Sequence, residues 1–268
     1  MTEPNRHKAS VRSAFNQAAA SYDEAAAVQR EICHRLAAHA LTSAAGLRAE
    51  SLLDAGCGTG YGLNILRTAF PDASCIAVDF APAMLERLVD LARASDASVL
   101  PVCGDLETLP FGAESFDAVW SSLALQWCDP ARSLAEIARI LRPGGLAFIA
   151  TLGPRTLWEL RDAFSRIDQA EHVIRFHEVE LWLAAAQDCG LQSVAQARED
   201  AFALAPDLRQ LLRDIKAIGA HSVGEHRRRK PLGRAAWTTL QSSYETHRRP
   251  DRLLPATYDL ILLTLKKP

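Results

Sequence analysis

The segment that most constrains the fold is residues 51–60, SLLDAGCGTG. An apolar pair is followed at once by the acid Asp54. Three glycines come next, and they are Gly56, Gly58 and Gly60. Glycine lacks a Cβ, so backbone N–H groups in such a turn can approach a ligand closely. The pattern predicts a buried strand, a nucleotide-binding loop and a helix from about Thr59 to Phe70, as in doubly wound α/β folds.

After this loop the sequence alternates between short apolar runs and amphipathic segments. The runs that predict strands are CIAVD, SVLPVCGD, SFDAVWSS and LAFIATL. Together with the first strand they predict a parallel sheet covered by helices on both faces. A sixth strand is expected at 191–195 and a seventh at 257–266, the seventh antiparallel in an edge hairpin. We therefore expect an α/β fold with a doubly wound, seven-stranded mixed sheet.

A single domain over 1–268 is expected, because this length suits one core. An apolar stripe that begins at Val11 predicts N-terminal helices, which could lie across the strand ends as a lid. Tyr22 and Arg30 would then be candidates to touch cofactor or substrate, although core and surface positions remain equally open. Two helices after strand five predict an insertion. The expected parts are N-terminal helices (1–48), a cofactor-binding core (49–152), a helical insertion (153–190), and a C-terminal part of the sheet with basic helices (191–268).

Residues around the loop distinguish between nucleotides. A dinucleotide fingerprint needs a third Gly or Ala where this chain has Tyr61, and the Lys-Ser/Thr pair of a Walker loop is missing. Acids stand at three expected strand ends, and they are Asp54, Asp79 and Asp105. Three carboxylates around one ligand would repel a pyrophosphate and favour a cation. S-adenosylmethionine is a nucleoside with a sulfonium and an ammonium but no phosphate, so it fits both acids and glycines.

The hydrogen-bonding capacity of each acid suggests a role. We expect Asp54 to hold the methionine ammonium, Asp79 to accept from both ribose hydroxyls, and Asp105 to accept from the adenine amino group. An acid at a strand end can instead only cap the next helix. Capping explains one such acid well, but three acids after three apolar runs favour the cofactor.

Other features of the sequence argue against several classes of protein. No apolar run is long enough to span a membrane, and the first residues hold no apolar signal core, so we expect a cytoplasmic protein without a membrane partner. The six cysteines include no CxxC pair and HExxH is absent, so no metal is expected. No GxSxG motif marks a nucleophile. A nucleic-acid partner is not expected either.

Charge is unevenly distributed along the chain. Residues 206–268 hold 13 Lys and Arg against 6 Asp and Glu, whereas residues 1–205 hold 17 against 26. The densest basic stretch contains Arg227, Arg228, Arg229, Lys230 and Arg234. Such a stretch is commonly a solvated surface. The functional alternative is a docking surface for an acidic partner.

Several motifs together resemble a known family. LDAGCGTG, VDFAPAML, GDLETLPF, SFDAVWSSLALQW and RILRPGG are similar, in matching order, to class I S-adenosylmethionine-dependent methyltransferases. AFNQAAASYDEAAAVQR, LALQWC, HVIRF, LRDIKAIGA and LPATYDLIL resemble one branch, the malonyl-[acyl-carrier protein] O-methyltransferases of biotin synthesis. The resemblance implies methyl transfer from S-adenosylmethionine to a malonyl thioester on acyl carrier protein, or on coenzyme A, with S-adenosylhomocysteine as the second product.

The resemblance also implies roles for individual residues. It places Met84 and Leu106 against the adenine, Ser121 and Leu123 at the methionine end, and Arg175 on the substrate carboxylate. The basic C-terminal stretch would dock the acidic carrier protein. Two alternatives stay open: a methyltransferase of another small acid, and a cofactor-binding assembly factor or protein-modifying enzyme of the type that serves respiratory complex I.

Overall fold

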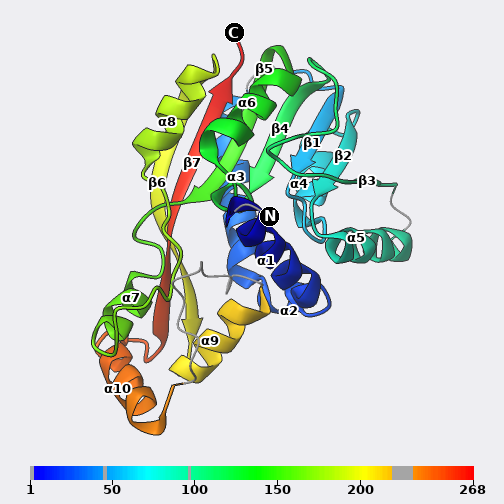
Figure 1. Ribbon diagram of the computed structural model, residues 1–268. Helices are drawn as coiled ribbons and strands as arrows, with labels where there is room; N and C mark the ends of the chain where they lie inside the picture. Colours follow the sequence, from blue (N-terminus) through cyan, green and yellow to red (C-terminus); the bar gives the residue numbers. More distant parts are fainter. Residues whose placement is uncertain (1–2, 45–46, 96–97, 219–231) are drawn as a thin grey trace.

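The computed structural model describes residues 3–44, 47–95, 98–218 and 232–268, and one seven-stranded sheet lies at its centre (Figure 1). The strands are β1 (Ser51–Ala55), β2 (Ser74–Asp79), β3 (Leu100–Cys103), β4 (Phe116–Ser122), β5 (Leu141–Leu152), β6 (Gln192–Ala205) and β7 (Leu254–Lys266). They lie in the order β3-β2-β1-β4-β5-β7-β6, and only the two pairs that include β7 are antiparallel. The expected doubly wound mixed sheet is confirmed.

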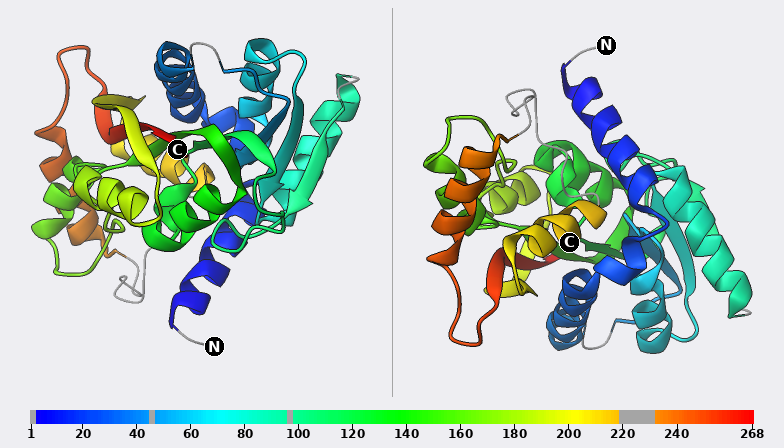
Figure 2. Two further views of the ribbon diagram at one scale, coloured as in Figure 1. Left: turned by 90° about the horizontal axis from the view of Figure 1, so that it is seen from above. Right: turned by 90° about the horizontal axis from the view of Figure 1, so that it is seen from below.

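Helices surround the sheet on both faces and at the ends of its strands. They are α1 (Glu3–Ala18), α2 (Tyr22–Ala25), α3 (Ala27–Ser43), α4 (Tyr61–Ala69), α5 (Pro82–Ala94), α6 (Pro130–Ile140), α7 (Trp158–Ser165), α8 (Val179–Asp188), α9 (Leu208–Ala217) and α10 (Arg234–Glu245), with one short 3-10 helix, η1 (Leu125–Trp127). α3 and α4 pack on one face, and α6 and α8 pack on the other. The views in Figure 2 show these layers from the two ends of the strands.

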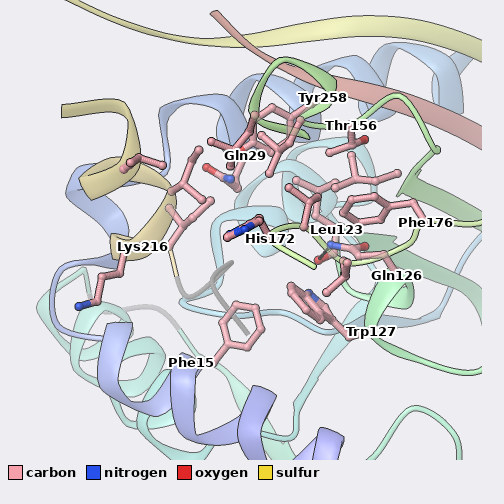
Figure 3. A pocket seen from close by; sticks show the side chains of 18 of the residues that line it. Phe15, Gln29, Leu123, Gln126, Trp127, Thr156, His172, Phe176, Lys216 and Tyr258 are labelled. Atoms are coloured by element: carbon pink, nitrogen blue, oxygen red, sulfur yellow. Dashed lines mark hydrogen bonds between the residues drawn. The ribbon is translucent and has the colours of Figure 1, made fainter. Parts of the chain in front are cut away.

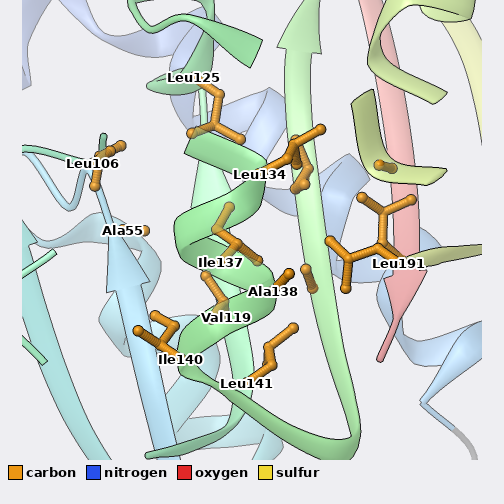
Figure 4. Packing of buried hydrophobic residues seen from close by; sticks show 14 of the residues in the cluster. Ala55, Leu106, Val119, Leu125, Leu134, Ile137, Ala138, Ile140, Leu141 and Leu191 are labelled. Atoms are coloured by element: carbon orange, nitrogen blue, oxygen red, sulfur yellow. The ribbon is translucent and has the colours of Figure 1, made fainter. Parts of the chain in front are cut away.

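Side chains alternate along each central strand, which explains why both faces need cover. In β1, Leu53 joins the cluster under α6 and α8, whereas its neighbour Leu52 joins the cluster under α3. Successive side chains of a strand point to opposite faces, so an unbroken apolar run is buried on both sides. Figure 4 shows the first cluster, in which Leu134 and Ile137 of α6 lie over Val119 of β4.

The edge of the sheet differs from the prediction in extent. β7 runs antiparallel as expected, but it lies between β5 and β6, so β6 is the edge strand. β6 covers Gln192–Ala205 rather than 191–195. Many of its side chains are polar and exposed, because an edge strand needs no continuous apolar run. Apolar content alone therefore underestimates its length.

A smaller apolar cluster forms around the ends of β6 and β7. It includes Leu160 of α7, Leu211 of α9 and Tyr244 of α10, whose hydroxyl donates to Pro255 O (2.8 Å). The expected insertion at 153–190 is therefore divided between this cluster and the main core. Its first helix, α7, belongs to this cluster, but α8 packs against α6 and buries Trp182 fully in the main core. α8 is a regular covering helix because its apolar side faces the sheet.

The first two helices lie across the carboxyl ends of the parallel strands (Figure 2, right). α1 contacts α5, and the ring of Phe15 lies edge-on to Phe80 (6.3 Å between centroids) and to Trp127 (5.8 Å). α1 ends at Ala18, and Tyr22 begins the separate helix α2. α3 then leaves this lid and packs on the sheet.

One buried acid in β7 should contribute strongly to stability. Asp259 is fully buried and accepts from Arg198 Nε (2.8 Å) and Nη2 (2.7 Å) and from Arg155 N (3.0 Å). Burial raises its pKa, but the bonds from the two arginines outweigh burial, so the pKa is lowered. Asp259→Asn should lower the free energy of unfolding by about 2 kcal/mol in urea denaturation, because Arg198 and Arg155 keep their charges and lose the buried carboxylate that neutralises them.

The control for this variant is Asp251→Asn, which removes an exposed pair with Arg249 (3.3 Å) and should cost less than about 1 kcal/mol. The folded pKa of Asp259 lies below its unfolded value. Its contribution is therefore present at neutral pH and is lost as the pH falls below about 4. Equal losses in the two variants would contradict the assignment.

Candidate functional site

The loop after β1 is held in a tight turn beside β2. Gly56 N donates to Val78 O (2.8 Å), and Gly58 N donates to Asp79 Oδ2 (3.0 Å). Gly58 has φ +53°, and a Cβ there would meet no other atom within 4 Å, because the residue borders a cavity. We call this cavity the glycine-loop cleft. A hollow beside Asp54 shares Tyr22, Gly56, Gly58, Ser122 and Leu123 with the hollow beside Asp105, and the name covers both as the two ends of one cleft.

Asp54, at the end of β1, is a buried acid with an unsatisfied oxygen. Its side chain is 2% exposed, and its Oδ2 has no hydrogen-bond partner among the described residues. Burial raises its pKa to about 8, with a smaller contribution from the charge of Asp79. A Cβ at Gly62 would lie 2.9 Å from this oxygen, so glycine there leaves room beside the carboxyl. Such an acid at the wall of a cavity is placed to bind a cation.

Asp79, at the end of β2, connects the glycine loop to the start of α5. Besides the bond from Gly58, its Oδ1 accepts from Ala81 N (2.8 Å). Burial raises the pKa of this carboxyl, although the backbone N–H groups act in the opposite direction. Met84 and Phe80 line the cleft beside it. Each carboxylate oxygen can accept more than one hydrogen bond, so Asp79 retains capacity for ligand hydroxyls.

Asp105 lies at the same edge of the sheet and already has a cationic partner. Lys8 of α1 donates from Nζ to both oxygens of Asp105 (2.9 and 2.6 Å) and lies 2.8 Å from Glu107 Oε2. Burial lowers the pKa of Lys8, but the bonds to the two acids outweigh burial and raise it. A ligand amino group would share Asp105 with Lys8, for which Glu107 is a second acceptor. Leu106 adds an apolar wall.

The end of the cleft beside Asp54 is closed by α2 and α3. Arg30 lines it and donates to Asp23 O (2.5 Å). Asp23 Oδ1 accepts from Thr59 Oγ1 (2.6 Å), which connects α2 to the glycine loop. Tyr22 lines both ends of the cleft, and burial raises its pKa. A guanidinium, a phenol and an unsatisfied acid together suit an amino-acid group that carries both charges.

A second cavity of about 290 Å³, which we call the side cavity, adjoins the cleft (Figure 3). Its walls are mainly apolar and include Leu160, Phe164 and Ile215. Tyr22 and Leu123 line the side cavity and both ends of the cleft, so they mark the junction. The polar residues around it include Gln29, Gln126, Trp127, Thr156, His172, Lys216 and Tyr258.

Most predicted cofactor residues meet in the glycine-loop cleft. Those that line it are Tyr22, Arg30, Asp54, Gly56, Gly58, Asp79, Met84, Asp105, Leu106 and Leu123. Gly60 instead precedes α4, where a Cβ would lie 2.3 Å from Leu88 Cδ1. Ser121 does not reach the cleft, because its Oγ donates to Ala55 O (2.8 Å) within the sheet. The next residue, Ser122, points the other way and lines the cleft.

Arg175 and Arg234, the predicted substrate and docking residues that the structure describes, line neither the cleft nor the side cavity. The side chain of Arg175 is 91% exposed and lies 3.4 Å from Glu171; it lines an open neighbouring cavity that shares Phe164 and His172 with the side cavity, but not the side cavity itself. Its role on the substrate carboxylate stays a prediction that this position does not favour. Arg234 is exposed at the start of α10. The other predicted docking residues, Arg227, Arg228, Arg229 and Lys230, lie outside the described residues.

Sequence reasoning did not select several residues that line the cavities. Lys8 and Phe15 come from α1, and nothing in the local sequence distinguishes Lys8 from a surface lysine. Gln29 and Trp127 lie in two of the motifs that carried the resemblance, AFNQAAASYDEAAAVQR and LALQWC. Their place at the junction of the two cavities is visible only in the folded chain.

The cleft fits S-adenosylmethionine chemically. Asp54 has an unsatisfied oxygen for an ammonium, Asp79 has acceptor capacity for a ribose, and the loop backbone at Gly58 is open to the ligand. In the described ranges, no group of three or more His, Cys, Asp or Glu side chains is arranged to hold a metal ion. The described helices include none that is both long and apolar enough to cross a membrane.

Known proteins resemble this chain in sequence and in fold. The family model described as "Methyltransferase domain" matches residues 53–149. The geranyl diphosphate C-methyltransferase of Streptomyces coelicolor, solved with Mg2+, geranyl diphosphate and S-adenosyl-L-homocysteine, has a TM-score of 0.53 at 17% identity, over 86% of this chain and 79% of that one. This likeness confirms the methyltransferase fold.

Curated relatives define the family more narrowly. The malonyl-[acyl-carrier protein] O-methyltransferase of Dechloromonas aromatica is 43% identical over 97% of this chain and 95% of that protein. The biotin biosynthesis bifunctional protein of Teredinibacter turnerae is 36% identical over 98% of this chain and 48% of that protein. At this identity and coverage, the chain belongs to the malonyl-[acyl-carrier protein] O-methyltransferase family.

Proposed function

We propose that this protein methylates the free carboxylate of a malonyl thioester on acyl carrier protein, with S-adenosylmethionine as the methyl donor. The products are the malonyl methyl ester and S-adenosylhomocysteine, and the reaction serves biotin synthesis. The observation that carries the proposal is the junction at Tyr22 and Leu123, where an apolar side cavity meets the acidic glycine-loop cleft. The names of the relatives support the substrate.

The residues of the cleft divide between the parts of the cofactor. Asp79 would accept from the ribose hydroxyls, and Asp105 from the adenine amino group. Asp54 and Arg30 would hold the ammonium and carboxylate of the amino-acid end. S-adenosylmethionine, when bound, supplies a methyl group activated by a positively charged sulfur. Phe15 in α1 covers this cleft and helps to exclude water.

The side cavity suits a reaction that needs no general base. A malonyl half-acid has a carboxyl pKa of about 4 and is therefore an anion at neutral pH. The protein has only to orient this anion at the junction and to keep water out. The apolar side chains of Leu160, Phe164 and Ile215 lower the local dielectric constant. A low dielectric constant favours a reaction in which opposite charges neutralise each other.

The acidic carrier protein would dock on the basic C-terminal part of the chain. The sequence predicts this role for Arg227, Arg228, Arg229, Lys230 and Arg234. Lys216 supports this placement, because it is exposed and lines the side cavity. Docking at this side would direct the thioester arm along α9 into the cavity.

Salt should separate the carrier-bound substrate from the coenzyme A thioester. We expect KM for malonyl-carrier protein to rise about tenfold between about 50 and 500 mM salt, and KM for malonyl-coenzyme A to rise about twofold. Salt screens the attraction between the two charged protein surfaces. Binding of the small coenzyme A thioester does not use this surface contact, so salt affects it less. Steady-state kinetics on the same enzyme preparation measures both. Equal salt sensitivity would count against docking at the basic surface.

The test of the function itself uses a labelled methyl donor. The purified protein is incubated separately with malonyl-carrier protein, malonyl-coenzyme A and free dicarboxylic acids, and each product is analysed for a methyl ester by mass spectrometry. We expect ester on the malonyl thioesters and little on the free acids. Transfer only to a free acid, or to none of these substrates, would refute the proposal.

A further inference from the structure

Three side chains that line the side cavity carry a buried polar atom with no hydrogen-bond partner among the described residues: Gln29 Oε1 of α3, and Gln126 Oε1 and Trp127 Nε1 of η1. Gln126 does not line the cleft, so Gln29 and Trp127 are the two that lie at the junction. Gln29 lines the side cavity and the Asp54 end of the cleft, whereas Trp127 lines the side cavity and the Asp105 end. Buried polar atoms are nearly always paired. Two unpaired atoms around one junction therefore indicate a polar ligand group that lies between them.

Trp127 can act only as a donor, because an indole nitrogen has no lone pair to offer. Its ring is held edge-on against Phe15 (5.8 Å, 85°), and its backbone N donates to Ala124 O (3.1 Å). Leu125, at the other end of η1, is fully buried in the main core. The N–H is thus fixed in direction, and the group that it lacks is an acceptor.

Gln29 can also present a donor to the cavity. It lies within hydrogen-bond reach of the Tyr258 hydroxyl, and Figure 3 shows both side chains at the same wall. Burial raises the pKa of Tyr258 to about 12, so the hydroxyl keeps its proton at neutral pH. The amide of Gln29 can turn by half a rotation. Oε1 then accepts from the Tyr258 hydroxyl, and Nε2 takes the position that is unpaired, where its N–H can donate.

We infer that Gln29 and Trp127 form the subsite that holds the substrate carboxylate during methyl transfer, with Tyr258 orienting the Gln29 amide. The inference rests on the proposed function and deepens it. His172, which lies 2.7 Å from Asp168, and Lys216 also line the side cavity but do not line the cleft. They are placed for other parts of the thioester, because the reacting carboxylate must sit at the junction.

A subsite of neutral donors suits the chemistry of this step. One carboxylate oxygen forms a bond to the methyl carbon while the methyl–sulfur bond breaks and its electron pair stays on sulfur. No proton moves. An arginine would pair with the carboxylate and compete with the sulfonium for its charge. Two N–H groups fix the direction of the anion and leave the sulfonium as its counter-charge.

The test uses Trp127→Phe, which keeps the ring but removes the N–H, and Gln29→Glu, which keeps the shape but repels an anion. We expect kcat/KM for malonyl-carrier protein to fall by at least about tenfold in Trp127→Phe and by about 100-fold or more in Gln29→Glu. The affinity for S-adenosylhomocysteine, measured by calorimetry, should stay within about threefold. The controls are Trp158→Phe and Gln17→Glu, at residues that line neither cavity.

A binding measurement separates positioning from a merely structural role. Malonyl pantetheine and its methyl ester are titrated into the complex with S-adenosylhomocysteine. The wild-type protein should prefer the carboxylate, and Gln29→Glu should lose this preference. If the wild-type protein is active and both variants keep full activity, the inference alone is overturned. The same holds if the variants lose S-adenosylhomocysteine binding together with activity. A wild-type protein that methylates no malonyl thioester would overturn the proposed function and this subsite with it.

Discussion

Asp54→Asn should stabilise the free protein and, at the same time, abolish tight binding of S-adenosylmethionine. Burial raises the pKa of Asp54 to about 8, against an ordinary value of 3.8. Each unit of such a difference corresponds to about 1.4 kcal/mol. Asparagine keeps the shape without the ionisation cost, so the melting temperature at about pH 8 should rise by about 5 °C or more. The ammonium of the ligand loses its counter-charge, so its affinity should fall by at least about 100-fold in calorimetry.

The pH dependence of both effects follows from the same shift. Because the folded pKa of Asp54 lies above the unfolded value, this group stabilises the protein fully below about pH 4 and loses that contribution as the pH rises to about 8. The stability gain of Asp54→Asn should therefore grow from about pH 4 to about pH 8. Binding of the ammonium favours the ionised acid, so the wild-type protein should release close to one proton per cofactor at about pH 6.5. The variant should release none.

Asp117→Asn is the matched control, because the same chemical change should have the opposite effect on stability. Burial raises the pKa of Asp117, but the bond from Arg142 (2.7 Å) and the N–H groups of Glu50 and Ser51 (both 2.9 Å) outweigh it and lower the pKa. This variant should lose stability and keep cofactor affinity. If both variants lost stability, the unsatisfied state of Asp54 would be refuted.

The convergence of the three acids could be predicted because it follows from topology. Asp54 is the last residue but one of β1, Asp79 ends β2, and Asp105 follows β3. These strands are parallel neighbours in the order β3-β2-β1. The carboxyl ends of parallel strands meet at one edge of a sheet, so acids at the ends of consecutive strands come together. Local patterns and one topological rule were sufficient here.

Contacts between distant segments could not be predicted in this way. Lys8 meets Asp105 across 97 positions of sequence, and neither residue carries a local signal for the other. Whether Ser121 or Ser122 faces the cleft depends on the register of β4 at its end. An error of one position in the predicted register moves a side chain to the opposite face of the sheet. Arg175 was assigned through resemblance alone, and only the fold places it at the surface.

Asp79→Ala should also cause a large loss of cofactor affinity. The carboxylate has two functions: it would accept from the ribose hydroxyls, and it holds the N–H groups of Gly58 (3.0 Å) and Ala81 (2.8 Å) around the ligand. Charge-assisted hydrogen bonds contribute about 1.5–3 kcal/mol each, so the dissociation constant should rise by about 100- to 1,000-fold. Asp79→Asn keeps one acceptor oxygen and should have a smaller effect.

Stability should respond to Asp79→Ala much less than binding does. The buried carboxylate has a raised pKa, so its removal relieves an ionisation cost while it frees two backbone N–H groups. Asp90→Ala, on the exposed side of α5, is the control and should leave both quantities unchanged. Calorimetry with S-adenosylhomocysteine and thermal melting distinguish the two effects. Because α1 and α2 close over this cleft, the loss should appear mainly as faster ligand dissociation. An unchanged affinity in a folded Asp79→Ala protein would show that the ligand does not lie along β2.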